Sequence, residues 1–163
     1  MSFYNILVGQ LSRVQDSTSE GAASLQDVVR LSNAAGLATA LSYEGGSVVL
    51  SADLFLVADK PSPALVMTFF GQDALEHEED ILEALKAGDA SSIPVEMVTV
   101  NLVTADGSSL LDWDSSPSTT FSFTDIDRLI DAFCKVVFNT PTLAEAEKIL
   151  DDHLNWGFER TDY

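Results

Sequence analysis

Apolar residues that recur every three or four positions predict four helices along the chain. Each predicted helix follows a residue whose side chain can accept a hydrogen bond from the backbone N–H groups of a first turn. These predicted N-caps are Ser24, Asp73, Thr124 and Thr142. Gly36 and Gly88 mark the ends of the first two helices, because glycine readily adopts the left-handed backbone that closes a helix. The second helix is expected to cover residues 73–87.

Runs of apolar or alternating residues between these helices predict short strands. The strands are expected at 3–8, 37–43, 48–57, 64–70, 95–104, 110–113 and 119–123. A turn at 44–47 contains adjacent glycines and is expected to join the second and third strands into a hairpin. In the strand at 95–104, Val98, Val100 and Leu102 are expected to share one face.

Strands and helices come in clusters rather than in strict alternation, which is typical of an α+β fold. A chain of 163 residues with 46% hydrophobic content can bury one substantial core. We therefore expect a single domain over residues 1–163, with a largely antiparallel sheet packed against about four helices. Segments 37–87 and 95–138 each place three strands before a helix, but no repeat of residues supports a duplication.

The apolar runs are too short for a membrane span, since the one at 64–70 falls far below the roughly 20 residues that a spanning helix needs. The first residues lack the basic and long apolar segments of a secretory signal. We therefore expect a cytoplasmic protein, or one of the host cytoplasm if it is viral. The only cysteine, Cys134, leaves no internal disulfide and lies beside Ile130 and Phe133. We expect it to be a buried packing residue, with a reactive thiol as the alternative.

The net charge is the property of the sequence that says most about the partners of this protein. The formal net charge is −18, and its distribution is uneven. Residues 1–72 hold six acids and three bases, a net of −3, whereas residues 73–163 hold twenty acids and five bases, a net of −15. Solubility alone needs a net charge of only about 2 to 8 for a small domain. Because such a surface repels nucleic acid and anionic lipid, we expect a basic protein surface as the partner, with no direct nucleic-acid or membrane binding.

The helix predicted at 73–87 carries the densest acidity. Its acids recur at spacings of three and four residues and are Glu76, Glu79, Asp80 and Glu83. Like charges at these spacings destabilise an isolated helix by about a few tenths of a kcal/mol. One interpretation is that the acids solvate an exposed face, helped at the helix start by the helix dipole. The other is that they present a row of negative charge to a basic partner, and we retain all of them as candidate partner-binding residues.

A second candidate partner-binding group is Asp112, Trp113 and Asp114. Tryptophan is a frequent anchor of protein interfaces, so one placed between two acids suits a basic partner. The alternative is that Trp113 packs in the core. With Asp106 these aspartates also supply oxygen ligands for calcium, but their spacing does not match an EF-hand loop. Solvated acids are therefore expected here, and no metal.

Catalytic motifs are missing from the sequence. His77 and His153 are the only histidines, and neither stands at a metal-binding spacing. The chain has no nucleophile elbow, no phosphate-binding loop and no dinucleotide-binding glycine motif. We therefore expect no cofactor and no enzyme.

The leading hypothesis is a non-enzymatic acidic module that binds a basic protein. It would act as an inhibitor that mimics the charge of nucleic acid, of the anti-restriction, anti-CRISPR or nuclease-immunity type. The alternative is a virion or tail component of a phage that assembles into a homo-oligomer, a hypothesis that rests on the strand content and the less charged first half. A metal-dependent enzyme using Asp112 or Asp114 comes third.

Overall fold

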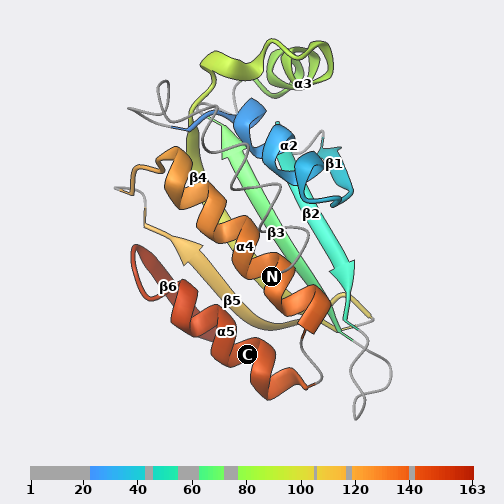
Figure 1. The fold of residues 1–163 in the computed structure, drawn as a ribbon, viewed down its shortest axis with the longest axis vertical. Coiled ribbons are helices and arrows are strands. Elements are labelled where there is room, and N and C mark those ends of the chain that lie inside the picture. Colours follow the sequence, from blue (N-terminus) through green and yellow to red (C-terminus); the bar gives the residue numbers. More distant parts are fainter. Residues whose placement is uncertain are drawn as a thin grey trace.

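The computed structural model describes residues 23–42, 46–54, 63–71, 77–104, 106–116, 119–139 and 142–163. These residues form a six-stranded sheet and four α-helices, which confirms the α+β fold (Figure 1). The strands are β1 Thr39–Ser42, β2 Ser47–Asp53, β3 Ala64–Gly71, β4 Val95–Val103, β5 Ser109–Ser115 and β6 Phe158–Asp162. The helices are α2 Leu25–Ala34, α3 Glu78–Ala87, α4 Phe123–Asn139 and α5 Leu143–His153, with a 3₁₀ turn, η1, at Ala90–Ser92. The strand predicted at 3–8 lies outside the described residues.

The sheet is an antiparallel meander. Its strand order follows the sequence, β1-β2-β3-β4-β5-β6, and each neighbouring pair is antiparallel. Helix α3 and η1 are inserted between β3 and β4, and α4 and α5 between β5 and β6. Consecutive strands therefore remain neighbours even where the connection between them is long.

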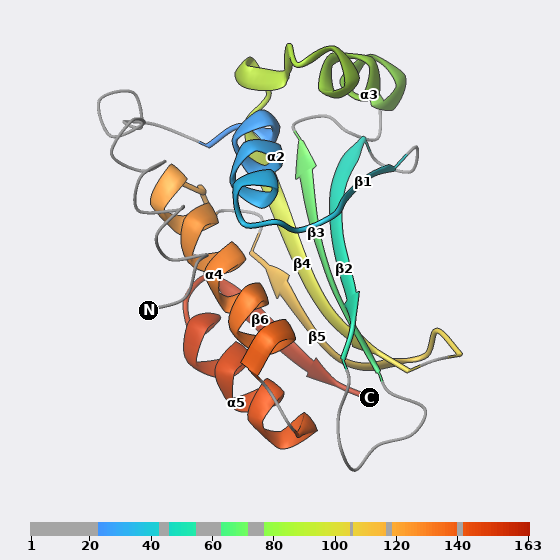
Figure 2. The same ribbon diagram turned by 45° about the vertical axis from the view of Figure 1, so that its right-hand side comes forward.

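The hydrophobic core lies between one face of this sheet and helices α2, α4 and α5 (Figures 1 and 2). Alternate strand residues point into it, because successive side chains of a strand face opposite sides. On β4 these are Val98, Val100 and Leu102, all fully buried, as the alternation predicts. Helix α3 lies apart, across the end of the sheet next to β1 and β2, and buries Ile81 and Leu85.

The start of α2 follows the prediction closely. The Ser24 side chain accepts a hydrogen bond from the Asp27 backbone N–H (3.2 Å), and the Asp27 carboxylate accepts one from the Ser24 N–H (2.9 Å). The helix then passes close to the end of β3. A Cβ atom at Gly71 would lie 2.7 Å from side-chain atoms of both Leu25 and Ile93. A glycine at this position therefore lets α2 approach the sheet.

Two helix starts differ from the prediction. Helix α3 begins at Glu78 after a non-helical His77, five residues later than the start predicted at Asp73, a residue that lies outside the described part of the chain. Helix α4 begins at Phe123, so the strand predicted at 119–123 is wrong. The N-cap of α4 is Ser122 and not Thr124. The Ser122 hydroxyl accepts from the Asp125 N–H (3.2 Å), and the Asp125 carboxylate accepts from the Ser122 N–H (2.9 Å).

The last strand, β6, was not predicted. Its sequence "FERTD" has one apolar residue, so neither periodicity nor composition marks it as a strand. It pairs with β5 and brings Phe158 against Trp156 and Phe121, with ring centroids 5.4 and 6.1 Å away. This edge-to-face cluster attaches the end of the chain to the core.

Within the described ranges, no helix is both long enough and apolar enough to cross a membrane.

Candidate functional site

The face of the sheet opposite α2, α4 and α5 carries no helix among those the structure describes (Figure 2). We call it the open sheet face. Strand pairing places on it the residues at 49–53, 64–70, 97–103, 112–114 and 159–161 that alternate with the core residues. Ser51, Met97, Asp114, Glu159 and Thr161 are exposed there. This surface is accessible along the strands β2 to β6.

The open sheet face is apolar or uncharged over its middle strands. Val49, Val66 and Phe70 are half-buried, and Met97, with 41% of its surface exposed, is one of the most exposed large apolar residues of the described chain. Thr68 pairs across the strands with Val49, which places a small polar side chain among these apolar ones. The middle of the face therefore suits contact with aliphatic side chains of another molecule.

Acidic side chains gather on β5 and β6. Asp112 and Asp114 are two residues apart on β5, so both point to the open sheet face, and Asp114 lies directly opposite Glu159. Partial burial first, and then the negative charges of Asp112 and Glu159, raise the pKa of Asp114 above its ordinary value. The strands thus hold three carboxylates close together on one face.

Asp112 has hydrogen-bonding neighbours on both sides. The Asn101 side-chain amide, oriented with its nitrogen toward the acceptors, donates to Asp112 Oδ1 (3.1 Å) from β4. A hydrogen bond with Asp112 raises the pKa of Tyr163, at the end of β6. Asp112 is therefore fixed in position by both neighbouring strands.

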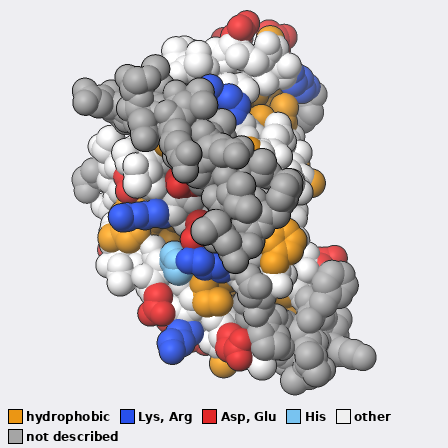
Figure 3. Space-filling view, viewed as in Figure 1, with side chains coloured by type: hydrophobic (Ala, Val, Ile, Leu, Met, Phe, Trp, Pro, Cys, Tyr) orange, Lys and Arg blue, Asp and Glu red, His pale blue; other side chains and the backbone are white. Residues whose placement is uncertain are grey.

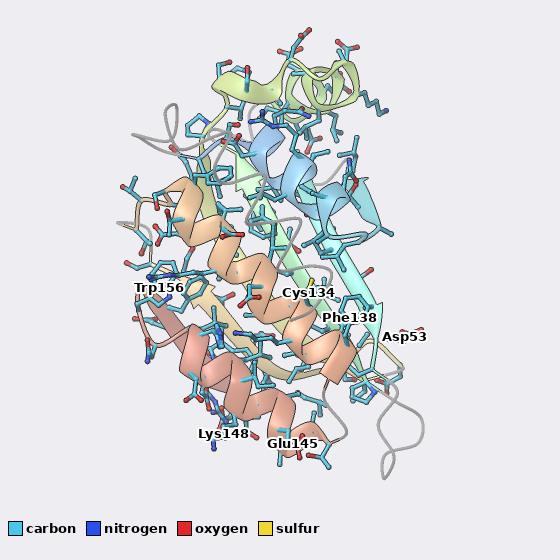
Figure 4. The ribbon with its side chains drawn as sticks, viewed as in Figure 1. Asp53, Cys134, Phe138, Glu145, Lys148 and Trp156 are labelled. Carbon is cyan, nitrogen blue, oxygen red and sulfur yellow. The ribbon has the colours of Figure 1, made fainter. Side chains whose placement is uncertain are left out.

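Basic side chains are found elsewhere. Of the described lysines and arginines, five lie on helices: Arg30, Lys86, Arg128, Lys135 and Lys148. The sixth, Arg160 on β6, points to the helix side and forms ion pairs with Glu147 and Asp151 of α5 and, at 2.7 Å, with Asp162. The helix-covered side shows lysines and arginines among its acids (Figure 3), and Lys148 projects into solvent from α5 (Figure 4). No described base lies on the open sheet face.

Of the two interpretations that the sequence leaves open for Trp113, an interface anchor and a core residue, the structure shows the core residue. It points to the helix side of the sheet and only 2% of its surface is exposed. Its indole N–H donates to Asp151 Oδ1 (3.1 Å), and the Arg160 guanidinium lies 5.7 Å from its ring centroid. Because strand residues alternate in direction, the neighbours Asp112 and Asp114 necessarily face the other way. Trp113 is therefore a core residue that joins β5 to α5.

The acids of α3 form a separate surface. Glu79, Asp80 and Glu83 are exposed and make no ion pair with any described residue, while Glu76 lies outside the described part of the chain. Helix α3 lies across the end of the sheet near β1 and β2 (Figures 1 and 2), whereas Asp112 and Asp114 are on β5. With β3 and β4 in between, the two groups predicted from the sequence do not form one patch.

The other candidate residues have structural positions. Asp106 lies in the β4–β5 turn, where hydrogen bonds from the Thr104 hydroxyl first and then from Ser108 lower its pKa. Burial between α4 and the sheet, with a smaller effect of Asp131, raises the pKa of Cys134 to about 12, which makes its thiol a poor nucleophile (Figure 4). In the part of the chain that is described, no cluster of three or more His, Cys, Asp or Glu side chains is arranged to hold a metal ion.

Neither histidine belongs to a metal-binding cluster of described residues. His77 is exposed at the start of α3. The His153 ring uses Nδ1 to contact the Ile149 carbonyl oxygen (2.9 Å), and its Nε2 lies 3.4 Å from Lys135 Nζ. This geometry connects α5 to α4.

Comparison with models of known protein families, with characterised proteins and with solved structures finds no significant match.

The sequence drew attention to Asp112 and Asp114 but not to Glu159 or Met97. Glu159 could be found only by recognising β6, whose residues lack an apolar alternation. Met97 belongs to a predicted strand, and its exposure depends on which face of the sheet the helices cover. Neither the strand that carries Glu159 nor the exposure of Met97 can be recognised from the neighbouring residues in the sequence.

Proposed function

We propose that this protein is a non-enzymatic binding module that presents an acidic surface to a basic region of another protein. One observation carries the proposal. The open sheet face combines an apolar middle with the carboxylates of Asp112, Asp114 and Glu159, and no described lysine or arginine lies on it. Complementary charge of this kind favours encounter with a positively charged partner and disfavours a negative one.

Enzymes that handle nucleic acid supply such partners, because their clefts are basic and bind phosphate backbones. The proposed role is therefore inhibition by occupation of such a cleft, of the anti-restriction, anti-CRISPR or nuclease-immunity type. A formal charge of −18 makes repulsion of nucleic acid itself the expected behaviour. We place the protein in the cytoplasm, or in the host cytoplasm if it is viral.

A competition experiment tests this role. A labelled DNA duplex is bound to each member of a panel of restriction and CRISPR nucleases, and the full-length protein is added while fluorescence anisotropy is recorded. We expect the protein to displace the duplex from at least one enzyme, with an inhibitor affinity that falls steeply between low and moderate salt. Tight binding that ignores both salt and charge reversal at Asp112, Asp114 and Glu159 would contradict the proposal.

Assembly of identical chains is the second candidate function, as in a virion or tail component. The observation that favours it is at the sheet edge. Strand β1 pairs only with Ser47–Leu50 of β2, so the outer edge of Ser51–Asp53 has no strand partner among the described residues. An unpaired edge can add a strand from another molecule. Size-exclusion chromatography with light scattering decides between the two, since a stable monomer at high concentration excludes an assembly built on this edge.

A further inference from the structure

We infer that the open sheet face, and not the acidic surface of α3, is where the basic partner docks, and that the docking segment carries aliphatic side chains next to lysine or arginine. This inference rests on the proposed function and names the surface that performs it.

The order of side chains across the strands supports a mixed apolar and basic occupant. One row runs through Val49, Thr68, Thr99, Asp114 and Glu159, from β2 to β6. Neighbouring strands are about 4.8 Å apart, so the row passes from one apolar residue, Val49, through two threonines to two carboxylates within the length of a short peptide segment. A partner segment lying across the strands would meet aliphatic surface first and carboxylates next.

The next row runs through Ser51 on β2, Val66 on β3, Asn101 on β4, Asp112 on β5 and Thr161 on β6. It has one apolar residue, Val66, on β3 and one carboxylate, Asp112, on β5. Met97, 41% exposed, adds an apolar contact near the end of the face where β3 and β4 pair through Phe70. Both rows therefore have their acids on β5 and β6, whereas one further exposed acid of this face, Asp53, lies on β2. One segment of a partner can contact both kinds of surface together.

The arrangement of charge also favours the sheet over α3. Like charges directly opposite each other on paired strands are destabilising, and Asp114 and Glu159 stand in that relationship, with Asp112 on the same face. The partial burial that raises the pKa of Asp114 makes its ionised form less favourable still. A lysine or arginine placed beside these carboxylates would relieve the repulsion.

The acids of α3 offer less to a partner. Glu79, Asp80 and Glu83 are exposed to water, as Asp114 and Glu159 are, so their charge interactions are likewise weakened by solvent and screened by salt. The three large apolar side chains of this helix, Ile81, Leu82 and Leu85, are buried. A partner docked on α3 would therefore gain charge contacts but no comparable apolar contact.

The same charges argue against other occupants. A second copy of the chain would bring another formal charge of −18, and a nucleic acid would bring its phosphates against the same carboxylates. A basic protein segment is the occupant that matches both the acidic and the apolar parts of the face.

Two sets of substitutions with the same change in charge test the inference. The sheet variant combines Asp112→Asn, Asp114→Asn and Glu159→Gln, and the matched control on α3 combines Glu79→Gln, Asp80→Asn and Glu83→Gln. The probe is a synthetic amphipathic peptide with lysines on one side and leucines on the other. It is titrated by calorimetry at low salt into the full-length protein and into both variants, after circular dichroism has shown that each is folded.

We expect the sheet variant to bind the peptide at least about tenfold more weakly than the wild type, which corresponds to a loss of roughly 1.4 kcal/mol. The α3 variant should lose less than about threefold, because its charges are distant from the docking face. Equal losses in both variants, or a larger loss in the α3 variant, would overturn the docking surface while leaving an acidic binding module in place. A wild-type protein that does not bind the peptide at all would overturn the proposed function as well.

The apolar part of the inference has its own pair of variants. Met97→Ser removes an exposed apolar side chain from the open sheet face, and Phe138→Ser removes an aromatic side chain that is 62% exposed at the end of α4. We expect only Met97→Ser to weaken binding of the amphipathic peptide, and neither variant to change binding of an oligolysine peptide. If Met97→Ser has no effect on the amphipathic peptide, the contact is purely electrostatic and the inferred occupant is wrong.

Two further measurements test whether the open sheet face binds a second copy of the chain or nucleic acid instead. Light scattering that shows a dimer broken by the sheet variant would assign the face to a second copy. Binding of a DNA duplex that is weakened by the same variant would assign it to nucleic acid. Either result overturns the inference.

Discussion

Asp114 on β5 and Glu159 on β6 are direct cross-strand partners, so two carboxylates face each other on the exposed side of the sheet. Opposite charges at such positions stabilise a pair of strands, and like charges weaken it. Since β6 is the last strand of the described sheet and pairs there only with β5, the repulsion acts across its one described strand pairing.

The first prediction is that Glu159→Lys stabilises the protein by about 0.2 to 1 kcal/mol at neutral pH and low salt. The substitution places an opposite charge beside Asp114 and should also lower the pKa of that carboxyl. Urea denaturation measures the stability, and carboxyl chemical shifts followed by NMR measure the pKa. Glu96→Lys is the control, because it makes the same change in net charge at an exposed residue of β4. Equal stabilisation by both variants would mean that total charge, and not the cross-strand pair, is responsible.

The second prediction concerns the hydrogen bond from Trp113 to Asp151. Asp151→Ala leaves the buried indole N–H without its acceptor and removes a partner of Arg160. We expect a loss of about 1 to 3 kcal/mol in the free energy of unfolding, because an unsatisfied buried donor retains its desolvation penalty. Asp152→Ala, at the exposed neighbouring residue, should change it by less than about 0.5 kcal/mol. Comparable losses in the two variants would show that the hydrogen bond contributes little.

The sequence predicted the elements that carry a strong local signal. The capping residue Ser24 and the alternation of Val98, Val100 and Leu102 each depend on a few neighbouring residues, and the structure bears both out. The α+β class followed from the order of these elements alone.

The elements that were missed depend on distant contacts. Strand β6 is polar because four of its five residues are exposed, and it becomes a strand through pairing with β5 and the packing of Phe158. The position of Trp113 in the core, and hence the outward direction of Asp112 and Asp114, follows from which face α4 and α5 cover. Tertiary packing decides whether β6 forms and which way the residues of β5 point, and the local sequence pattern does not show either.

The third prediction separates the two candidate caps of α4. Ser122→Ala removes the hydroxyl that accepts from the Asp125 N–H, and should destabilise the protein by about 1 kcal/mol. Thr124→Ala changes an exposed residue inside the first turn and should have an effect below about 0.5 kcal/mol. Thermal and urea denaturation of the two variants measure the difference. A larger effect at Thr124 would contradict the capping geometry.

The fourth prediction concerns Asp127 on α4. Burial first, and the negative charge of Asp131 second, raise its pKa to about 6, and its buried Oδ1 has no hydrogen-bond partner among the described residues. Because the folded protein binds this proton more tightly than the unfolded chain does, the stabilising contribution is complete below the unfolded pKa of about 3.9 and is lost as pH rises through about 6. At neutral pH the ionised carboxylate therefore costs stability.

Asp127→Asn should remove that cost without changing the shape of the side chain. We expect the variant to match the wild type near pH 4 and to exceed it by about 1 to 2 kcal/mol at neutral pH, less than the full shift implies because solvent screens a half-buried carboxylate. Unfolding free energies measured from pH 4 to neutral pH give the difference directly. Asp89→Asn, at an exposed residue after α3, is the control and should show no such rise. If the difference between Asp127→Asn and the wild type stays constant over this range, the carboxylate does not titrate there, and the raised pKa is wrong.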